Sequence, residues 1–299
     1  MKKIFSLITL SFLTISLLDA QILSSNQWRR ARHELVFGAG STNFLGDLGG
    51  ANTIGSHSIK DINFKSSRFI FYGGYDYRLS ERWSVGGTLA FGQLYGSDAF
   101  TKEEHRHSRD LHFRSPIIEL SPLVHYYILT ERYTKTTRVG QRGSGVTRPG
   151  IYMYTGVSGL WFNPKAKYTD GKWYALQPLG TEGQGWGVDT REKYKRITVA
   201  IPVGIGIQFP LNKTTSIGFE YAFRYTFSDY LDDCSTSYVG KSIFGDNDKA
   251  RYFSDPTEGG WVGAGVNQQR GNSQNNDTYI FIAFTLKYKI QQKVYMPKF

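Results

Sequence analysis

The sequence contains one cysteine, Cys234, so no disulfide within the chain can stabilise its fold. Beyond the first residues, no apolar run approaches the roughly 18 residues that a membrane-spanning helix needs, which argues against a helical membrane protein. The hydrolase motif G-x-S-x-G and the zinc-protease motif H-E-x-x-H are absent. Gly204-x-Gly206 lies within an alternating stretch and not before a helix, so it is no dinucleotide-binding fingerprint. We therefore expect no catalytic residues and no cofactor.

Aromatic residues, in contrast, are abundant. Tyr and Phe each occur 20 times, and aromatic residues make up 15% of the 299-residue chain. Such a content is expected where aromatic girdles line the two surfaces of a membrane. The formal net charge of +11 is spread along the chain and favours contact with anionic lipid or with an acidic partner.

The beginning of the chain is typical of a secretory signal peptide. Lys2 and Lys3 form a basic start, residues 4–18 are mainly apolar, and cleavage is expected after Ala20. The predicted organisation is a signal peptide at 1–20, a periplasmic segment at 21–32, an outer-membrane barrel at 33–290 and a C-terminal tail at 291–299. Nucleic acid is not an expected partner of an exported chain.

Residues 194–228 carry the clearest pattern. From 197 to 209 and from 217 to 227, the odd positions are large and apolar, whereas the even positions are mostly small or polar. Residues 210–214 (PLNKT) have the composition of a turn. Because successive side chains of a strand point to opposite faces, the segment predicts a β-hairpin with one very apolar face. The other face, with Glu220 and Arg224 among glycine and alanine, suits the narrow inside of a small barrel whose outside meets lipid.

Weaker versions of this alternation recur along the chain. They predict strands at 33–42, 68–78, 83–96, 113–128, 151–162 and 278–290. With the hairpin, the fold class is all-β: a transmembrane antiparallel β-barrel of about eight strands with long extracellular loops. Pro116 and Pro122 are unusual in a central strand and weaken the assignment of 113–128.

The inward positions of the predicted strands carry charge. The residues assigned to this lumenal network are Arg68, Asp76, Arg78, Glu119, Arg196, Glu220 and Arg224. They could form a proton or ion path, or they could be buried pairs that fill the lumen. Because the interior of an eight-stranded barrel is just wide enough for side chains, the second interpretation is favoured.

One long connection falls on the periplasmic side, where the other connections are tight turns. Residues 130–149 are basic, and Arg132, Lys135, Arg138 and Arg142 are the candidate contacts with a periplasmic partner.

Metal and catalytic sites find little support. His105, His107 and His112 could bind a metal if their loop folded back, but their spacing matches no standard site, and we predict no metal. Ser121 and His125 are the only inward pair that resembles hydrolase chemistry, and no third member accompanies them.

Five segments together resemble a known family. They are 44–48 (FLGDL), 162–166 (FNPKA), 176–185 (LQPLGTEGQG), 201–206 (IPVGIG) and 229–236 (DYLDDCST). In these segments the chain resembles the PorG-type outer-membrane proteins of the Bacteroidetes. The glycine and acidic residues at 179–185 and 229–233 are its most specific parts, and turn organisation is a simpler role for them than ligand binding.

The resemblance implies a non-enzymatic component of the type IX protein secretion system, which is linked to gliding motility in some relatives. It implies outer-membrane lipid as surroundings and, as partners, a periplasmic ring of the PorK lipoprotein and PorN, which the barrel would anchor. The alternative is a small barrel that acts as a solute channel or binds a hydrophobic ligand. A lipid-hydrolysing barrel is a third possibility, but no set of residues supports it.

Overall fold

A computed structural model describes residues 27–48, 64–100, 109–134, 146–257 and 266–291. The predicted signal peptide and, except for Gln291, the predicted tail lie outside these residues. The strands are β1 (His33–Leu45), β2 (Arg68–Arg78), β3 (Trp83–Ser97), β4 (His112–Leu129), β5 (Arg132–Thr134), β6 (Val146–Arg148), β7 (Gly150–Gly156), β8 (Ser158–Phe162), β9 (Lys165–Lys167), β10 (Trp173–Ala175), β11 (Ile197–Pro210), β12 (Thr215–Thr226) and β13 (Thr278–Ile290). The helices are α2 (Gln27–Arg30), η3 (Phe64–Ser66), η4 (Asp98–Phe100), η5 (Lys241–Phe244) and α4 (Asp248–Ser254).

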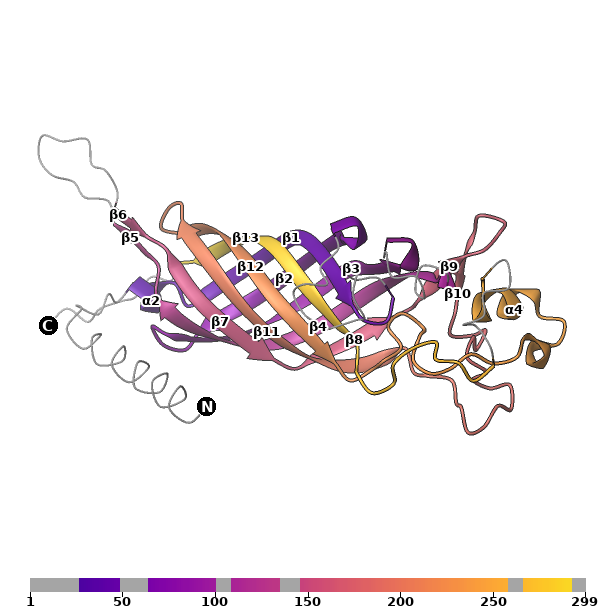
Figure 1. The fold of residues 1–299 in the computed structure, drawn as a ribbon. Helices are drawn as coiled ribbons and strands as arrows, with labels where there is room; N and C mark the ends of the chain where they lie inside the picture. The colour runs from indigo at the N-terminus through magenta and orange to yellow at the C-terminus, as the bar shows by residue number, and fades with distance from the viewer. Residues whose placement is uncertain (1–26, 49–63, 101–108, 135–145, 258–265, 292–299) are drawn as a thin grey trace, which may run out of the picture.

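The long strands close into a ring in which every neighbouring pair is antiparallel (Figure 1). β1 pairs with both β2 and β13, so the first and last strands of the ring meet. β7 and β8 are one strand interrupted at Val157, because both pair with β4 and with β11. Counted in this way, the ring has eight strands. Closure removes the sheet edges, so that the backbone N–H and C=O groups of the strands can hydrogen-bond within the ring. A lipid environment requires this, because it offers no water as a partner.

The two faces of the ring differ in chemistry, as the alternation predicts. On β11, Ile197 is 69% exposed and Val203 47%, whereas Ala200 between them is fully buried. The same alternation holds on β4, where Leu120 is 60% exposed and its neighbour Glu119 is buried. Large apolar side chains therefore cover the outside, whereas most charged and small side chains of the strands lie inside, which is the arrangement of a transmembrane barrel. The predicted fold class is confirmed.

The two ends of the barrel are unlike each other (Figure 1). At the terminus end, where β1 begins and β13 ends, β2 and β3 are joined by a tight turn, as are β11 and β12. At the other, loop end lie the connections between β1 and β2, β3 and β4, β8 and β11, and β12 and β13, which include β9, β10 and α4. The third connection at the terminus end, between β4 and β7, is longer and contains the hairpin β5–β6.

Apolar packing inside the barrel is concentrated toward the loop end. Phe44, Ile70, Phe113 and Phe162 belong to one buried cluster that also takes in Leu231 from a loop. A second cluster, toward the terminus end, is built around three tyrosines and contains Leu123 and Ala222. No helix among the described residues is long and apolar enough to cross a bilayer.

The predicted strands differ from the structure mainly at their ends. β1 continues three residues past the predicted 42, because Asn43, Phe44 and Leu45 are buried beneath the loops. The single strand predicted at 151–162 is interrupted at Val157. Pro116 and Pro122 do lie within β4, and both are on its outward face.

Candidate functional site

The first polar centre of the lumen is formed around Glu119 on β4. Its carboxylate accepts hydrogen bonds from Arg224 Nε at 3.0 Å, Ser121 Oγ at 2.5 Å, Ser158 Oγ at 3.0 Å and the Tyr279 hydroxyl at 2.7 Å. These donors come from β4, β8, β12 and β13, so one carboxylate ties together strands on opposite sides of the ring. Glu119 is 1% exposed, and its partners compensate the cost of burying the charge.

A second centre, around Glu220 on β12, lies closer to the terminus end. Tyr72 donates to its carboxylate at 2.6 Å, Tyr154 lies at 3.4 Å, and Tyr152 makes a third contact. The ammonium of Lys287 lies 3.9 Å away and above the Tyr152 ring, 4.0 Å from its centroid. The carboxylate is therefore surrounded by hydroxyl donors and one cation.

The inner surface near the terminus end carries a third group of charges. Arg78 pairs with Glu34 at 3.1 Å, and its guanidinium lies 4.2 Å from the centroid of the Tyr127 ring. His125 Nδ1 lies 3.9 Å from Asp76 Oδ1, which is too far for a hydrogen bond. All five side chains are almost fully buried. The charged groups thus pack against one another and against tyrosine rings, an arrangement that does not favour the solute-channel alternative.

Five of the seven predicted lumenal residues lie inside the barrel, and two do not. Arg68 lies over the outward-facing Tyr95, 3.8 Å from its ring centroid, and donates to two backbone carbonyls. Arg196 is exposed before β11, with Nη1 3.4 Å from Asn163 Oδ1. Both arginines lie where their strands begin at the loop end. There the sheet no longer fixes whether a side chain points inward or outward. Their assignment to the lumen is wrong.

Sequence reasoning also missed four lumenal charges: Glu34, Glu131, Lys287 and Lys289. Lys289 and Glu131 form an ion pair, and Ser216 donates to the same glutamate at 2.7 Å. The signal for the two lysines was present, because they alternate with outward Leu286 and Tyr288 in β13. Glu131 follows β4 and gives no such signal, because it reaches the lumen from a loop.

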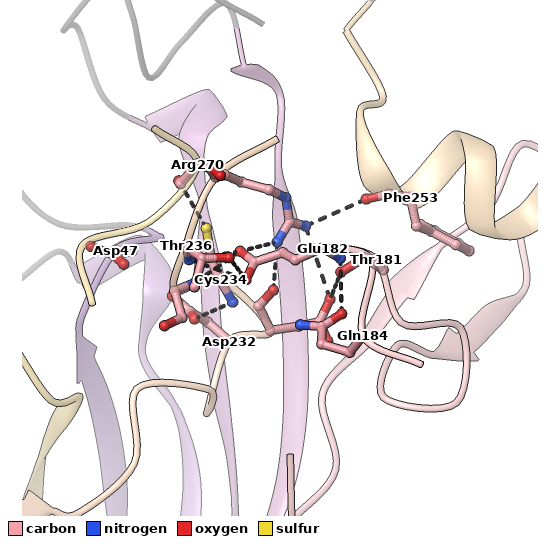
Figure 2. Close-up of polar contacts among 12 residues, drawn as sticks. Asp47, Thr181, Glu182, Gln184, Asp232, Cys234, Thr236, Phe253 and Arg270 are labelled. Atoms are coloured by element: carbon pink, nitrogen blue, oxygen red, sulfur yellow. Dashed lines mark hydrogen bonds and ion pairs between the residues drawn. The ribbon is translucent and has the colours of Figure 1, made fainter. Parts of the chain in front are cut away.

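The glycine-rich segment 179–185 and the acidic segment 229–236 meet at the loop end, around Glu182 (Figure 2). Its carboxylate accepts the backbone N–H of Ser235 at 2.9 Å and both the N–H and the hydroxyl of Thr236. Arg270 Nη1 donates to the same carboxylate at 2.9 Å and to the carbonyl of Asp233 at 2.6 Å. We call this assembly, residues 181–184, 232–236 and Arg270, the loop cap.

Further contacts extend the loop cap to the barrel. Thr181 and Tyr194 both donate to the Asp233 carboxylate at 2.5 Å. Asp232 accepts the backbone N–H of Leu48, three residues after the end of β1, at 3.0 Å. Burial raises the pKa of Asp233 to about 6, although the nearby Arg270 opposes the shift. The loop cap therefore joins segments from three loops through buried hydrogen bonds.

Arg109 ties the loop between β3 and β4 to the other loops at this end of the barrel. It donates to Asp98 through Nε at 2.7 Å and Nη2 at 3.0 Å, and to the carbonyls of Arg270 and Asp47 at 2.5 and 2.8 Å. Beside it, the thiol of Cys234 donates to the Arg270 carbonyl at 3.0 Å. Burial raises the pKa of this thiol well above its usual value, which keeps it protonated and unreactive. The arrangement stabilises loops and offers no activated nucleophile.

The described residues contain no group of three or more side chains that could hold a metal ion. His105 and His107 lie outside the described residues, and the ring of His112 accepts the backbone N–H of Lys167 at 3.0 Å.

The hairpin β5–β6 contains the described part of the predicted partner-binding segment. Arg132 pairs in register with Arg148, whose guanidinium donates to the carbonyl and hydroxyl of Thr130 at 3.0 Å. Arg132 is half-buried at the beginning of the hairpin. The other three predicted contacts, Lys135, Arg138 and Arg142, lie outside the described residues.

No protein-family model matches the chain, and no curated protein does either. Among solved structures, it resembles Ail of Yersinia pestis in complex with the heparin analogue sucrose octasulfate, with 10% identity, a TM-score of 0.38, and coverage of 86% of this chain and 97% of that one. OprG from Pseudomonas aeruginosa has 10% identity and a TM-score of 0.37, with 88% and 98% covered. A major outer membrane protein from Thermus thermophilus has 11% identity and a TM-score of 0.37, with 86% and 99% covered.

Proposed function

We propose that the protein is a non-enzymatic β-barrel of the outer membrane and that it serves as an anchor for protein partners. A closed ring with an apolar outer face needs a lipid environment, and a predicted signal peptide would export the chain to the compartment where barrels insert. The lumen is occupied by paired side chains around Glu119 and Glu220, which suits an anchor better than a conduit.

The partner would bind at the terminus end, and the hairpin β5–β6 carries this part of the proposal. The other connections there are tight turns, such as the one closed by the hydrogen bond from Leu211 N to Thr215 O. The described strands of the hairpin, β5 and β6, instead project beyond the barrel at this end (Figure 1). The resemblance to PorG-type proteins supports the periplasmic PorK/PorN-type ring of the type IX secretion system as the partner.

The test is affinity purification of the tagged protein from outer membranes, with ring proteins measured by mass spectrometry. A variant in which Arg132, Lys135, Arg138 and Arg142 are each changed to Gln should lose ring proteins. The matched control changes Lys172, Lys193, Lys249 and Arg251 to Gln, which removes the same charge at the loop end, and it should recover them.

Equal recovery by the two variants would reject the terminus end as the docking site. Failure of the unmodified protein to recover ring proteins would reject the secretion assignment. Heat-modifiable migration of each variant on detergent gels reports separately that its barrel has folded.

A further inference from the structure

The outward face of β8 and β9 changes from apolar to basic along one line. Val157, before β8, is 57% exposed, and Gly159 is exposed beyond it. Trp161 follows two residues later, half-exposed on the same face. Lys165 and Lys167 continue the line on β9. An apolar surface that ends in a tryptophan and then in lysines marks the level where hydrocarbon gives way to lipid head groups.

Two arginines join these lysines from neighbouring strands. Arg114 pairs in register with Lys165 and lies on the outward face of β4. Its guanidinium lies 4.0 Å from the centroid of the Trp173 ring, and this contact orients it. Arg196 approaches the segment between β8 and β9 through its 3.4 Å contact with Asn163. We call Arg114, Lys165, Lys167 and Arg196 the rim patch.

The rim patch has no acidic counterpart in the described part of the chain. None of its four cations has a carboxylate oxygen within 4 Å there, whereas the lumenal cations Arg78, Arg224 and Lys287 all do. Asp170, close to the rim patch in sequence, accepts from Lys172 N at 2.9 Å and from the Tyr174 hydroxyl at 2.8 Å. Cations that lie at head-group level without a carboxylate partner from the protein attract anionic groups of the lipid.

We propose that the rim patch binds phosphate groups of lipid head groups in the leaflet at the loop end. Guanidinium groups suit phosphate because they donate two parallel hydrogen bonds, and ammonium groups add charge. The inference rests on the proposed function, because it needs the apolar face to be embedded in a bilayer with the loops outside. It also assigns a role to Arg196, which does not lie in the lumen.

The test measures lipid retained by the detergent-purified full chain, by native mass spectrometry during titration with a diphosphorylated glycolipid. The variant K165Q/K167Q/R196Q leaves the stacked Arg114 in place. It should bind at least about tenfold more weakly, because each cation near an anionic surface contributes several-fold. The control K193Q/K213Q/R251Q removes the same charge elsewhere and should bind like the unmodified protein. The same glycolipid without phosphate should bind the unmodified protein no better than it binds the variant.

Inorganic pyrophosphate distinguishes the source of the phosphate. It should compete weakly if the membrane presents the head group, whereas complete competition at equal concentration would mean that a free phosphate ligand is recognised. Equal glycolipid binding by the two triple variants would overturn the inference. A chain that stays folded and monomeric without detergent would instead reject the proposed function itself, so the two failures are distinguishable.

Discussion

At the scale of single residues, the buried carboxylates of Glu119 and Glu182 are acceptable because each accepts several hydrogen bonds and is paired with an arginine. Glu182 is fully buried and receives hydrogen bonds from two backbone N–H groups, a hydroxyl and a guanidinium. Arg270, its partner, is 3% exposed. Removing one member of such a pair leaves the other as an uncompensated charge.

We therefore predict that Glu182→Gln opens the loop cap while the barrel remains folded. The expected loss of cap stability is about 3–5 kcal/mol, because Arg270 stays buried without its ion pair. Hydrogen exchange of residues 232–236 and 268–272 measures it. Asp189→Asn is the control, because its pair with Arg191 spans 3.8 Å and the Asp189 side chain is 76% exposed. Similar exchange in both variants would refute the role of Glu182.

The loop cap should also respond to pH. Burial raises the pKa of Asp233 to about 6 and that of Asp229, which precedes the loop cap and hydrogen-bonds to its Ser235, to about 8. In the unfolded chain both titrate near the ordinary value of about 3.9. The folded loops therefore keep protons that the unfolded loops release above about pH 4. Their stability is greatest below that pH and falls as pH rises, and the fall ends at about 6 for Asp233 and at about 8 for Asp229.

Hydrogen exchange of the loop cap should thus accelerate across this range. In Asp229→Asn the change between about pH 6 and about pH 8 should disappear, while the change that Asp233 causes below about pH 6 remains. Exchange that slows with rising pH, after correction for the intrinsic rate, would contradict the prediction.

At the scale of the element, β11 shows why glycine alternates with large residues. Gly204 faces the Tyr154 ring and Gly206 the Tyr152 ring, and a Cβ at either glycine would lie within 2.4 Å of a ring atom. The tyrosines belong to β7, which pairs with β11 at these positions, so each tyrosine ring covers the glycine opposite it. The small face predicted from the sequence is therefore the space that the lumenal tyrosines need.

Gly206→Ala should destabilise the barrel by about 1–3 kcal/mol, because its methyl group displaces the packed Tyr152 ring. The measurement is the urea midpoint of the protein refolded in detergent. Gly159→Ala on β8 is the control, since a Cβ there meets no atom within 4 Å. If both variants unfold at the same midpoint, the lumen is looser than the structure indicates.

At the scale of the whole molecule, the exposed apolar face is stable only if lipid covers it. Leu120, near the middle of β4, is 60% exposed. Leu120→Arg should cost about 2–4 kcal/mol in phospholipid vesicles, because a cation near the bilayer midplane loses its hydration. Val266→Arg, at a loop residue that is 62% exposed, should cost almost nothing. Equal midpoints for the two variants would show that the outer face does not meet hydrocarbon.

The sequence by itself determined the strands, the side of the ring to which most of their residues point, and hence the barrel. A strand has a period of two, so a local pattern such as 197–209 specifies both the element and its faces. The tertiary structure alone decided the rest. Arg68 and Arg196 lie outside the lumen because, at the ends of the strands, the alternation no longer determines the side to which a residue points. Glu182 meets Arg270, 88 residues later, because loops without periodicity are organised by contacts distant in sequence.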